Sequence, residues 1–184
     1  MPDFVIGIII AVVVLIVIIV LWYILTMNSL RKASLKVDEA NAGIDVALTK
    51  RYDVLTKQLD VVKGYASYES KTLYESIRLR KGMSFNEKKE MASKMDEVAN
   101  QFRIVAEAYP DLKAGQNYLA LQDSITDVEE HLQAARRLYN ANVTAYNTKI
   151  AMFPSSIVAG MCAMTKKELF EAESYKRQDV KMEF

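Results

Sequence analysis

The chain divides into an uninterrupted apolar stretch at its N-terminus and a long remainder in which apolar residues recur every three or four positions. From Phe4 to Leu25 there is no charged side chain. A run of roughly 20 apolar residues is what a helix needs to cross a hydrocarbon core of about 30 Å. Inside lipid such a helix satisfies its own backbone hydrogen bonds. The pattern therefore predicts one membrane-spanning helix, with residues 1–27 as a transmembrane anchor.

Two other interpretations of this segment fit less well. A secretory signal peptide has a basic start, an apolar core of about 7–15 residues and a small-residue cleavage site. Here Met1-Pro2-Asp3 carries an acidic residue, and the apolar run is longer than such a core. A buried core helix would need apolar partners, and nothing else in the chain is apolar enough to surround it. We therefore expect a retained anchor.

The charges that flank the apolar run predict its orientation. Arg31, Lys32 and Lys36 follow the run, whereas only Asp3 and the terminal amine precede it. Positive residues close to a span favour the cytoplasmic side of the membrane. The aromatic residues 22–23 lie where they would hold the inner interface. We expect the N-terminus outside and the remaining mass in the cytoplasm.

The residues after the apolar run follow a helical spacing. Apolar or small residues recur at intervals of three and four, as in a helix that packs on partners. No proline interrupts the chain between Asp3 and Tyr109. The sequence predicts one helix from the membrane to about Arg80, with a break at residues 26–29 as the alternative. The predicted inward seam of this helix comprises Leu30, Ala33, Val37, Ala40, Ile44, Ala47, Leu48, Leu55, Leu59, Val62, Ala66, Leu73 and Ile77.

A second helix is predicted after a turn at residues 81–83. Gly82 suits the position just past a helix C-terminus. Ser84 with Glu87 three residues later forms a capping-box pattern, which marks a helix start. Pro110 should end this helix, because proline disfavours a helical residue before it. Its inward positions are predicted to be Met91, Met95, Val98, Phe102, Val105 and Tyr109.

A third long helix is predicted from about Gln116 to Met152, and Pro154 should end it. Ser155 and Ser156 can cap a short fourth helix through Met161. The inward positions of the third helix are predicted to be Leu119, Ile125, Val128, Leu132, Ala135, Tyr139, Val143, Tyr146 and Ile150.

These elements together predict an all-α fold. Residues 31–184 contain no convincing period-2 alternation, so we expect no sheet. The architecture predicted is a single N-terminal transmembrane helix that continues into a long antiparallel helical bundle of three long helices and a short fourth. The bundle should occupy residues 28–170 in the cytoplasm, followed by a charged C-terminal tail at residues 171–184.

Composition excludes several classes of function. The chain has 24 basic and 23 acidic residues, a net charge of +1, which argues against nucleic-acid binding. It has no glycine-rich phosphate loop and no nucleophile elbow. His131 is the only histidine and Cys162 the only cysteine, a thiol that we expect to be buried and inert. We therefore expect no enzymatic activity, no metal and no cofactor.

Polar residues on the predicted inner faces form the remaining pattern. Asn140 and Asn147 are seven residues apart and so share one side of the third helix. An Asn in a packed seam usually sets register at some cost in stability. We expect a structural polar network that joins the two longest helices, with a ligand or metal site as the alternative. The candidate members are Asp45, Arg51, Asp53, Arg136, Arg137, Asn140 and Asn147.

Several motifs along the chain occur in a fixed order. They are Val37-Asp38-Glu39-Ala40 with Ile44-Asp45-Val46-x-Leu48, Lys50-Arg51-Tyr52-Asp53, Val62-Lys63-Gly64-Tyr65, Glu107-Ala108-Tyr109-Pro110-Asp111-Leu112-Lys113-Ala114, Ala135-Arg136-Arg137-x-Tyr139-Asn140-x-x-Val143-x-x-Tyr146-Asn147-Thr148 and Phe153-Pro154-Ser155. In these motifs the chain resembles the LemA family of bacterial membrane proteins over about residues 28–170. The motifs at residues 107–114 and 139–148 are specific in combination.

The resemblance implies an N-terminal anchor, an outside N-terminus, a cytoplasmic helical bundle and a bacterial source, but no reaction. Two departures limit what is carried over. At residues 54–59 the chain lacks the proline of the family's L-I-P-N-L, and at Tyr68-Glu69 it lacks the histidine of the family's H-E.

The leading functional hypothesis is a non-enzymatic scaffold in the bacterial inner (plasma) membrane, which self-associates and presents a helical surface to other proteins. The alternative is an accessory or sensor subunit that binds a small ligand or a partner protein in the bundle. The expected partners are the lipid bilayer and further copies of the chain, with partner membrane proteins as further candidates. Self-association is expected where the other helices are too short to cover the first one, through Leu30, Ala33, Val37, Ala40 and Ile44.

Overall fold

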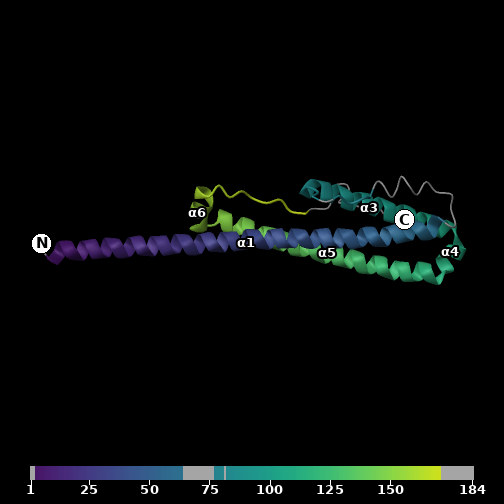
Figure 1. The fold of residues 1–184 in the computed structure, drawn as a ribbon, viewed down its shortest axis with the longest axis horizontal. Coiled ribbons are helices and arrows are strands. Elements are labelled where there is room, and N and C mark those ends of the chain that lie inside the picture. Colours follow the sequence, from purple (N-terminus) through teal and green to yellow (C-terminus); the bar gives the residue numbers. More distant parts are fainter. Residues whose placement is uncertain (1–2, 64–76, 81, 171–184) are drawn as a thin grey trace, which may run out of the picture. The chain divides into compact units, whose positions relative to one another are not determined.

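A computed structural model describes residues 3–63, 77–80 and 82–170 of the 184-residue chain. Within these residues every regular element is a helix and there is no strand, which confirms the all-α class (Figure 1). The predicted tail, residues 171–184, lies outside them. The helices are α1 (Asp3–Lys63), α3 (Phe85–Ala108), α4 (Pro110–Ala114), α5 (Gln116–Ala151) and α6 (Ser155–Met161).

The chain forms two compact units, and each combines part of α1 with part of α5. Unit 1 comprises Met1–Glu39 and Asn140–Leu169. Unit 2 comprises Ala40–Tyr139 and Phe170–Phe184. The two units are described separately below.

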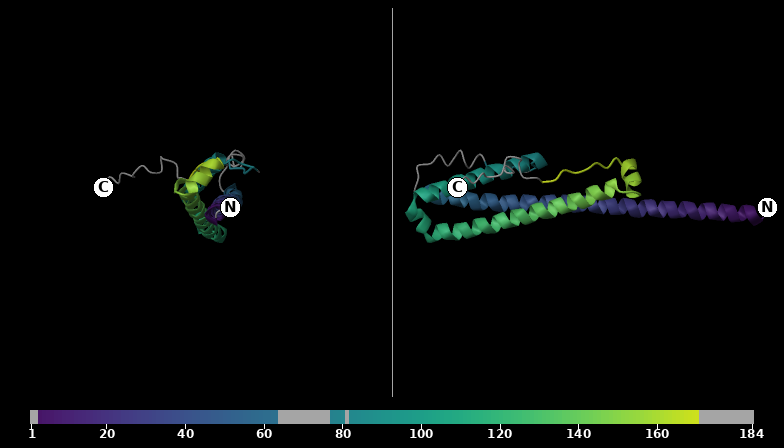
Figure 2. Two further views of the ribbon diagram at one scale, coloured as in Figure 1. Left: turned by 90° about the vertical axis from the view of Figure 1, so that its left-hand side faces the viewer. Right: turned by 180° about the vertical axis from the view of Figure 1, so that it is seen from behind.

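The N-terminal part of α1 is an apolar helix that nothing in unit 1 covers (Figures 1 and 2). All residues from Asp3 to Leu21 are exposed, and the large apolar side chains among them are at least 37% exposed. The helix is long and apolar enough to cross a membrane. Burial begins at residues 22–23 and is complete at Leu30. α1 is unbroken through residues 26–29, so the alternative of a break there is wrong.

The inward seam predicted for the first helix lies on α1 and is called the α1 seam. Its described positions are buried as predicted, but the helix ends earlier than predicted. Residues 77–80 are not helical, so the predicted end at Arg80 is wrong. The predicted seam positions Ala66 and Leu73 lie outside the described residues, and the Val62 side chain is not described either. The buried positions of the α1 seam are Leu30, Ala33, Val37, Ala40, Ile44, Ala47, Leu48, Leu55 and Leu59, together with the non-helical Ile77.

In unit 1 the contacts between α1 and α5 run antiparallel. Asn142 on α5 donates from Nδ2 to the carbonyl of Lys36 at 3.3 Å. Lys149, one heptad later on α5, donates from Nζ to Ser29 Oγ at 2.9 Å, one heptad earlier on α1. Both helices therefore keep the same face together over two turns, and the buried side chains between them form the core of this unit. That core includes Leu30, Val37, Val143, Tyr146 and Ile150.

In unit 2, α3 runs parallel to α1, which the predicted antiparallel arrangement did not include. Lys88 near the start of α3 donates to Asn41 on α1 at 3.1 Å. Arg51, ten residues further along α1, contacts Asp96 further along α3. The residue numbers rise together, so α3 begins beside the middle of α1 rather than at its end.

α5 runs antiparallel to α3 in the same unit. Phe85 at the start of α3 stacks on Tyr139 with 5.1 Å between ring centroids. Phe102 near the end of α3 stacks on Tyr118 near the start of α5 at 5.9 Å. The second pair belongs to a buried cluster at this end of the unit, which also includes Ala106 and Leu112.

The predicted start of α3 is confirmed in atomic detail. Ser84 is the N-cap, and its Oγ accepts from the backbone N–H of Glu87 at 3.3 Å. The Glu87 carboxylate in turn accepts from the backbone N–H of Ser84 at 2.7 Å. Two of the unpaired N–H groups of a helix start are thus satisfied by side chains. Gly82, just before the cap, has a φ of +80°, a conformation that glycine adopts without strain.

We expect Ser84→Ala to raise the pKa of Glu87 and to weaken the start of α3. The pKa of Glu87 is lowered from 4.5 mainly by the hydrogen bond from the Ser84 backbone, then by the Ser84 side chain, with a smaller contribution from Arg80. A carboxyl whose pKa is lowered on folding stabilises the fold above its unfolded pKa, and this stability is lost as the pH falls through the folded pKa.

Loss of an N-cap typically costs about 1 kcal/mol. NMR titration of the Glu87 carboxyl in both variants measures the pKa, with the exposed Glu90 as the internal control. The backbone N–H of residue 84 remains in the variant, so only the part of the lowering that is due to the hydroxyl is lost. An unchanged Glu87 pKa in Ser84→Ala would show that the hydroxyl does not act on this carboxylate.

Pro110 does end α3, and residues 110–114 then form the short helix α4, which was not among the predicted elements. Two predictions near the other helix ends are corrected. Ser155 begins α6 without capping it, because its hydroxyl donates to the carbonyls of Lys149 and Met152 at the end of α5. The predicted inward residues Leu119 and Tyr109 are exposed.

Candidate functional site

The guanidinium of Arg51 is the centre of a buried charged cluster in unit 2. Arg51 lies seven residues after Ile44 on the buried side of α1 and is 2% exposed. Its Nη2 contacts Asp96 Oδ1 of α3 at 2.6 Å and also pairs with the carboxylate of Glu129 on α5. Its Nη1 donates to the carbonyl of Ala92 at 3.1 Å. One arginine therefore joins three helices.

Arg136 on α5 is electrostatically coupled to the same cluster. Burial lowers the pKa of Arg136, the nearby Arg51 lowers it further, and Asp96 and Glu129 raise it. Its guanidinium lies over the ring of Phe170, 4.8 Å from the centroid. Two arginines and two carboxylates thus share one region, and their formal charges cancel. Such pairing is the usual condition for keeping charges away from water.

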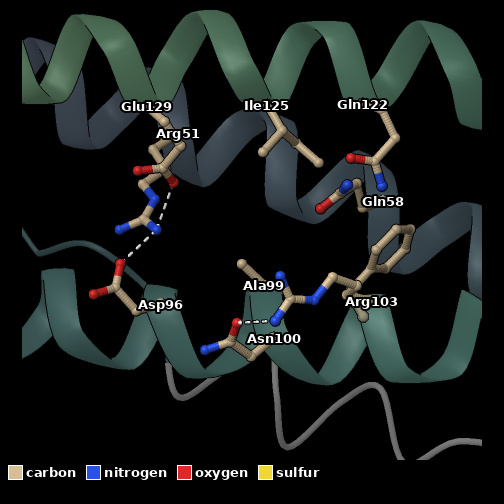
Figure 3. Close-up of a pocket in the computed structure, with 10 residues that line it drawn as sticks. Arg51, Gln58, Asp96, Ala99, Asn100, Arg103, Gln122, Ile125 and Glu129 are labelled. Atoms are coloured by element: carbon tan, nitrogen blue, oxygen red, sulfur yellow. Dashed lines mark hydrogen bonds and ion pairs between the residues drawn. The ribbon is translucent and has the colours of Figure 1, made fainter. Parts of the chain in front are cut away.

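A cavity of about 340 Å³ lies beside the cluster (Figure 3). Gln58 lies on the cavity wall, is 1% exposed, and neither its amide nitrogen nor its amide oxygen has a hydrogen-bond partner among the described residues. In Figure 3 this amide lies next to Gln122 of α5 and projects into the open space. Within the same residues the Nε of Arg51 is also buried without a partner. Buried polar groups are normally paired, so these atoms require an explanation.

The opposite wall of the cavity is supplied by α3. Arg103 is exposed, lines the cavity and donates to Asn100 Oδ1 at 3.4 Å. Gln122 donates from Nε2 to the hydroxyl of Tyr118 at 2.7 Å. Ile125 and Phe102 add apolar surface. The site therefore combines a donor–acceptor amide edge, the ion-paired Arg51 with its two carboxylates, a second arginine and a small apolar area, which are groups suited to recognition.

A second hollow of about 430 Å³ lies between α1 and residues 79–83. Its buried charge, Lys88, is paired with Asp45 Oδ1 at 2.7 Å and with Asn41 Oδ1 at 3.1 Å. Because this lysine is satisfied by the protein itself, we do not assign a ligand there.

The predicted polar network is only partly assembled. Arg51 and Arg136 meet, but their acidic partners are Asp96 and Glu129, which were not predicted. Of the other predicted members, Asp45 pairs with Lys88, and Asp53 and Arg137 are exposed. Asn140 and Asn147 belong to unit 1.

Asn147 has a different role in unit 1. Its amide donates to the carbonyl of Lys167 and accepts from the N–H of the same residue, both at 2.9 Å. Tyr146 donates its hydroxyl to the carbonyl of Thr165 at 3.2 Å. Lys167 also contacts Asp38 Oδ1 on α1 at 2.6 Å. These side chains hold the segment after α6 along α1 and α5, so Asn147 pairs with backbone instead of with the predicted arginines.

The five residues predicted to mediate self-association are not available at the surface. All are at most 8% exposed in the folded chain, so the premise that the other helices leave them uncovered is wrong. They are Leu30, Ala33, Val37, Ala40 and Ile44.

Metal-ligating side chains do not gather in the part of the chain that the structure describes. Residues 3–63, 77–80 and 82–170 contain no group of three His, Cys, Asp or Glu side chains placed to hold a metal ion. His131 is exposed and its Nε2 lies 3.6 Å from Asp127 Oδ1. Glu129, two residues earlier on α5, pairs with Arg51. Cys162 is half-buried, with its Sγ 3.6 Å from Met27 Sδ.

Comparisons with known proteins agree with the motifs. The model of the LemA family matches residues 40–184 of the chain. The chain is also similar to a protein of Metamycoplasma hominis named Protein LemA. The two are 29% identical over 163 residues, which cover 86% of this chain and 74% of that protein.

Proposed function

This chain belongs to the LemA family, and we propose that it is a membrane-anchored, non-enzymatic protein that presents a helical surface in the bacterial cytoplasm. The observation that carries the proposal is the contrast within α1. Its first part exposes only apolar side chains, and the same helix then buries one residue in three or four. A wholly apolar, uncovered helix is stable in lipid and unstable in water.

The proposed orientation places the N-terminus outside. Arg31, Lys32 and Lys36 are exposed directly after the apolar part of α1. In the inner membrane of a bacterium these charges favour retention on the cytoplasmic side. Both compact units would then lie in the cytoplasm.

Alkaline carbonate extraction of membranes that contain the full chain tests the anchor. We expect the chain to stay in the membrane pellet, because carbonate removes proteins held by charge alone and leaves spanning helices. Release into the supernatant would contradict the proposal.

Self-association belongs to the proposal, but through surfaces other than the α1 seam. The bundle exposes large apolar side chains such as Leu35, Val46, Ile104 and Leu138, which an interface could cover. Native mass spectrometry of the detergent-solubilised chain measures the copy number. A single copy at all concentrations would leave the anchor proposal intact and remove self-association from it.

A second candidate function, a sensor subunit that binds a small molecule, is favoured by the cavity at Gln58. The unpaired amide offers one acceptor and two donors to a ligand. Arg103 on the wall suits an anionic group. The ligand class that fits is a small molecule with an amide- or urea-like edge and a carboxylate or phosphate.

We expect Gln58→Leu to stabilise the fold and to abolish binding at the cavity. An unpaired buried amide costs about 1–3 kcal/mol, and leucine removes that cost at similar volume. Denaturation of both variants measures the gain. Native mass spectrometry of each, as purified from cells, shows whether a small molecule is retained by the wild type and lost in the variant. A stability gain without any retained molecule would mean that the cavity is structural, and a loss of stability would mean that the amide is paired after all.

A further inference from the structure

The turn from α5 into α6 is unusually apolar for a surface segment. From Ile150 to Thr165 the chain has no acidic, basic or histidine side chain, while Lys149 precedes this stretch and Lys166 follows it. Four large apolar side chains in it are more than half exposed, and we call them the α6 patch: Met152, Phe153, Ile157 and Met161.

α6 has one covered and one uncovered side. Ile157 and Met161 are four residues apart and so lie on the same helix face. Val158 and Ala159, which point away from that face, are buried. Scattered exposed apolar residues need no explanation, but a contiguous patch usually marks a surface that something covers.

Contacts within unit 1 place α6 beside the end of the apolar part of α1. Cys162, directly after α6, has its Sγ 3.7 Å from the Tyr23 hydroxyl and 3.6 Å from Met27 Sδ. Lys149 binds Ser29 at 2.9 Å. Since a helix rises about 1.5 Å per residue, Tyr23 and Ser29 are about 9 Å apart along α1. α6 therefore lies alongside the last turns of the apolar stretch, and Lys149 lies further from it.

We propose that the α6 patch is immersed in the interfacial layer of the bilayer that α1 crosses. This inference rests on the proposed function, because it requires α1 to span. If the apolar part of α1 ends in the membrane interface, the segment in contact with Tyr23 and Met27 must lie at the same depth. An apolar face flanked by lysines suits that layer, where apolar side chains reach the acyl boundary and lysines meet anionic headgroups.

The consequence is a second attachment to lipid. A single spanning helix can rotate about its axis and tilt in the bilayer. A second contact with lipid through α6 would restrict both motions of α1. The segment that follows α6 is held by the contact of Lys167 with Asn147 and Asp38. It would then start at the membrane and run along α1 and α5.

Depth-dependent quenching in vesicles tests the proposal on the full chain. In a Cys162→Ala background, single cysteines at Ile157, Met161, Leu138 and Val14 are labelled with bimane. Each variant is reconstituted into vesicles of phosphatidylcholine and phosphatidylglycerol that carry a nitroxide quencher at a shallow or a deep position. Leu138 is the matched control, because it is as exposed as the α6 patch but belongs to unit 2.

We expect the labels at Ile157 and Met161 to lose emission with the shallow quencher, the label at Leu138 to lose none, and the label at Val14 to be quenched by the deep one. If the labels at Ile157 and Met161 are unquenched, like the label at Leu138, while the label at Val14 is quenched, the inference is overturned and the anchor is left intact. An unquenched Val14 would overturn the anchor itself. Disulfide-linked dimers through a cysteine at Ile157, without quenching, would show that a second copy covers the patch and would also overturn the inference.

Discussion

Replacing Arg51 with methionine is expected to lower the free energy of unfolding by about 3–5 kcal/mol, the usual cost of removing one partner of a buried ion pair. The variant leaves the carboxylates of Asp96 and Glu129 without their common cation. It also leaves the carbonyl of Ala92 without its donor. Loss of helical circular dichroism with denaturant, in the full detergent-solubilised chain, measures the change.

Two further variants separate charge from volume. Arg137→Met changes an exposed arginine on α5 and should shift the unfolding free energy by no more than about 0.5 kcal/mol. Adding only Glu129→Gln to Arg51→Met should recover part of the loss, because Asp96 and Arg136 then remain as one negative and one positive charge in the cluster. If Arg51→Met is as stable as the wild type, the cluster does not hold the three helices together.

Replacing Ile44 with glutamate should have an effect of similar or greater size, roughly 4 kcal/mol or more. Ile44 is completely buried, so the variant removes an apolar core contact and places a carboxylate without a partner. Val46→Glu on the same helix is the matched control, since Val46 is 60% exposed and should tolerate the charge. Thermal unfolding of the two variants measures the difference.

The pair of variants also separates packing from assembly. If Ile44→Glu folds normally and only reduces the copy number in native mass spectrometry, Ile44 serves an interface between copies and the burial described here is wrong. If it unfolds while Val46→Glu does not, the α1 seam belongs to the fold of a single chain.

Spacing along the chain predicted which side of each helix is inward. Leu30, Val37, Ile44, Arg51 and Gln58 follow one another at intervals of seven, and all are buried. The rule depends on helix geometry alone and so requires no knowledge of the partner. Two of the residues at this interval, Arg51 and Gln58, are polar. A search for apolar residues alone therefore misses two buried positions. A heptad count that included them would have singled out Gln58.

The partners of these residues could not be predicted in the same way. Glu129 is followed by Glu130 and His131 and looks solvated by sequence, and only the direction of α3 brings Asp96 to Arg51. Helical spacing carries no information on the direction in which a second helix runs. Asn147 was misassigned because its partner is a backbone group, which every residue possesses.

Helix ends show the same division between local and distant causes. The Ser84–Glu87 capping box involves four consecutive residues and was predicted correctly. Ser155 has the composition of a cap for α6, but the carbonyls at the end of α5 are within its reach and take its hydroxyl. Competition between two neighbouring helix ends is decided by the geometry of the turn, which residue types alone do not specify.

Thiol labelling of intact cells tests the central claim, that α1 crosses the membrane and leaves both units in the cytoplasm. In a Cys162→Ser background, a cysteine at Asp3 or at the exposed Leu138 is treated with a membrane-impermeant maleimide before and after permeabilisation. We expect the cysteine at position 3 to be labelled in intact cells and the cysteine at position 138 to be labelled only after permeabilisation. Equal labelling of Leu138 in intact cells would contradict it.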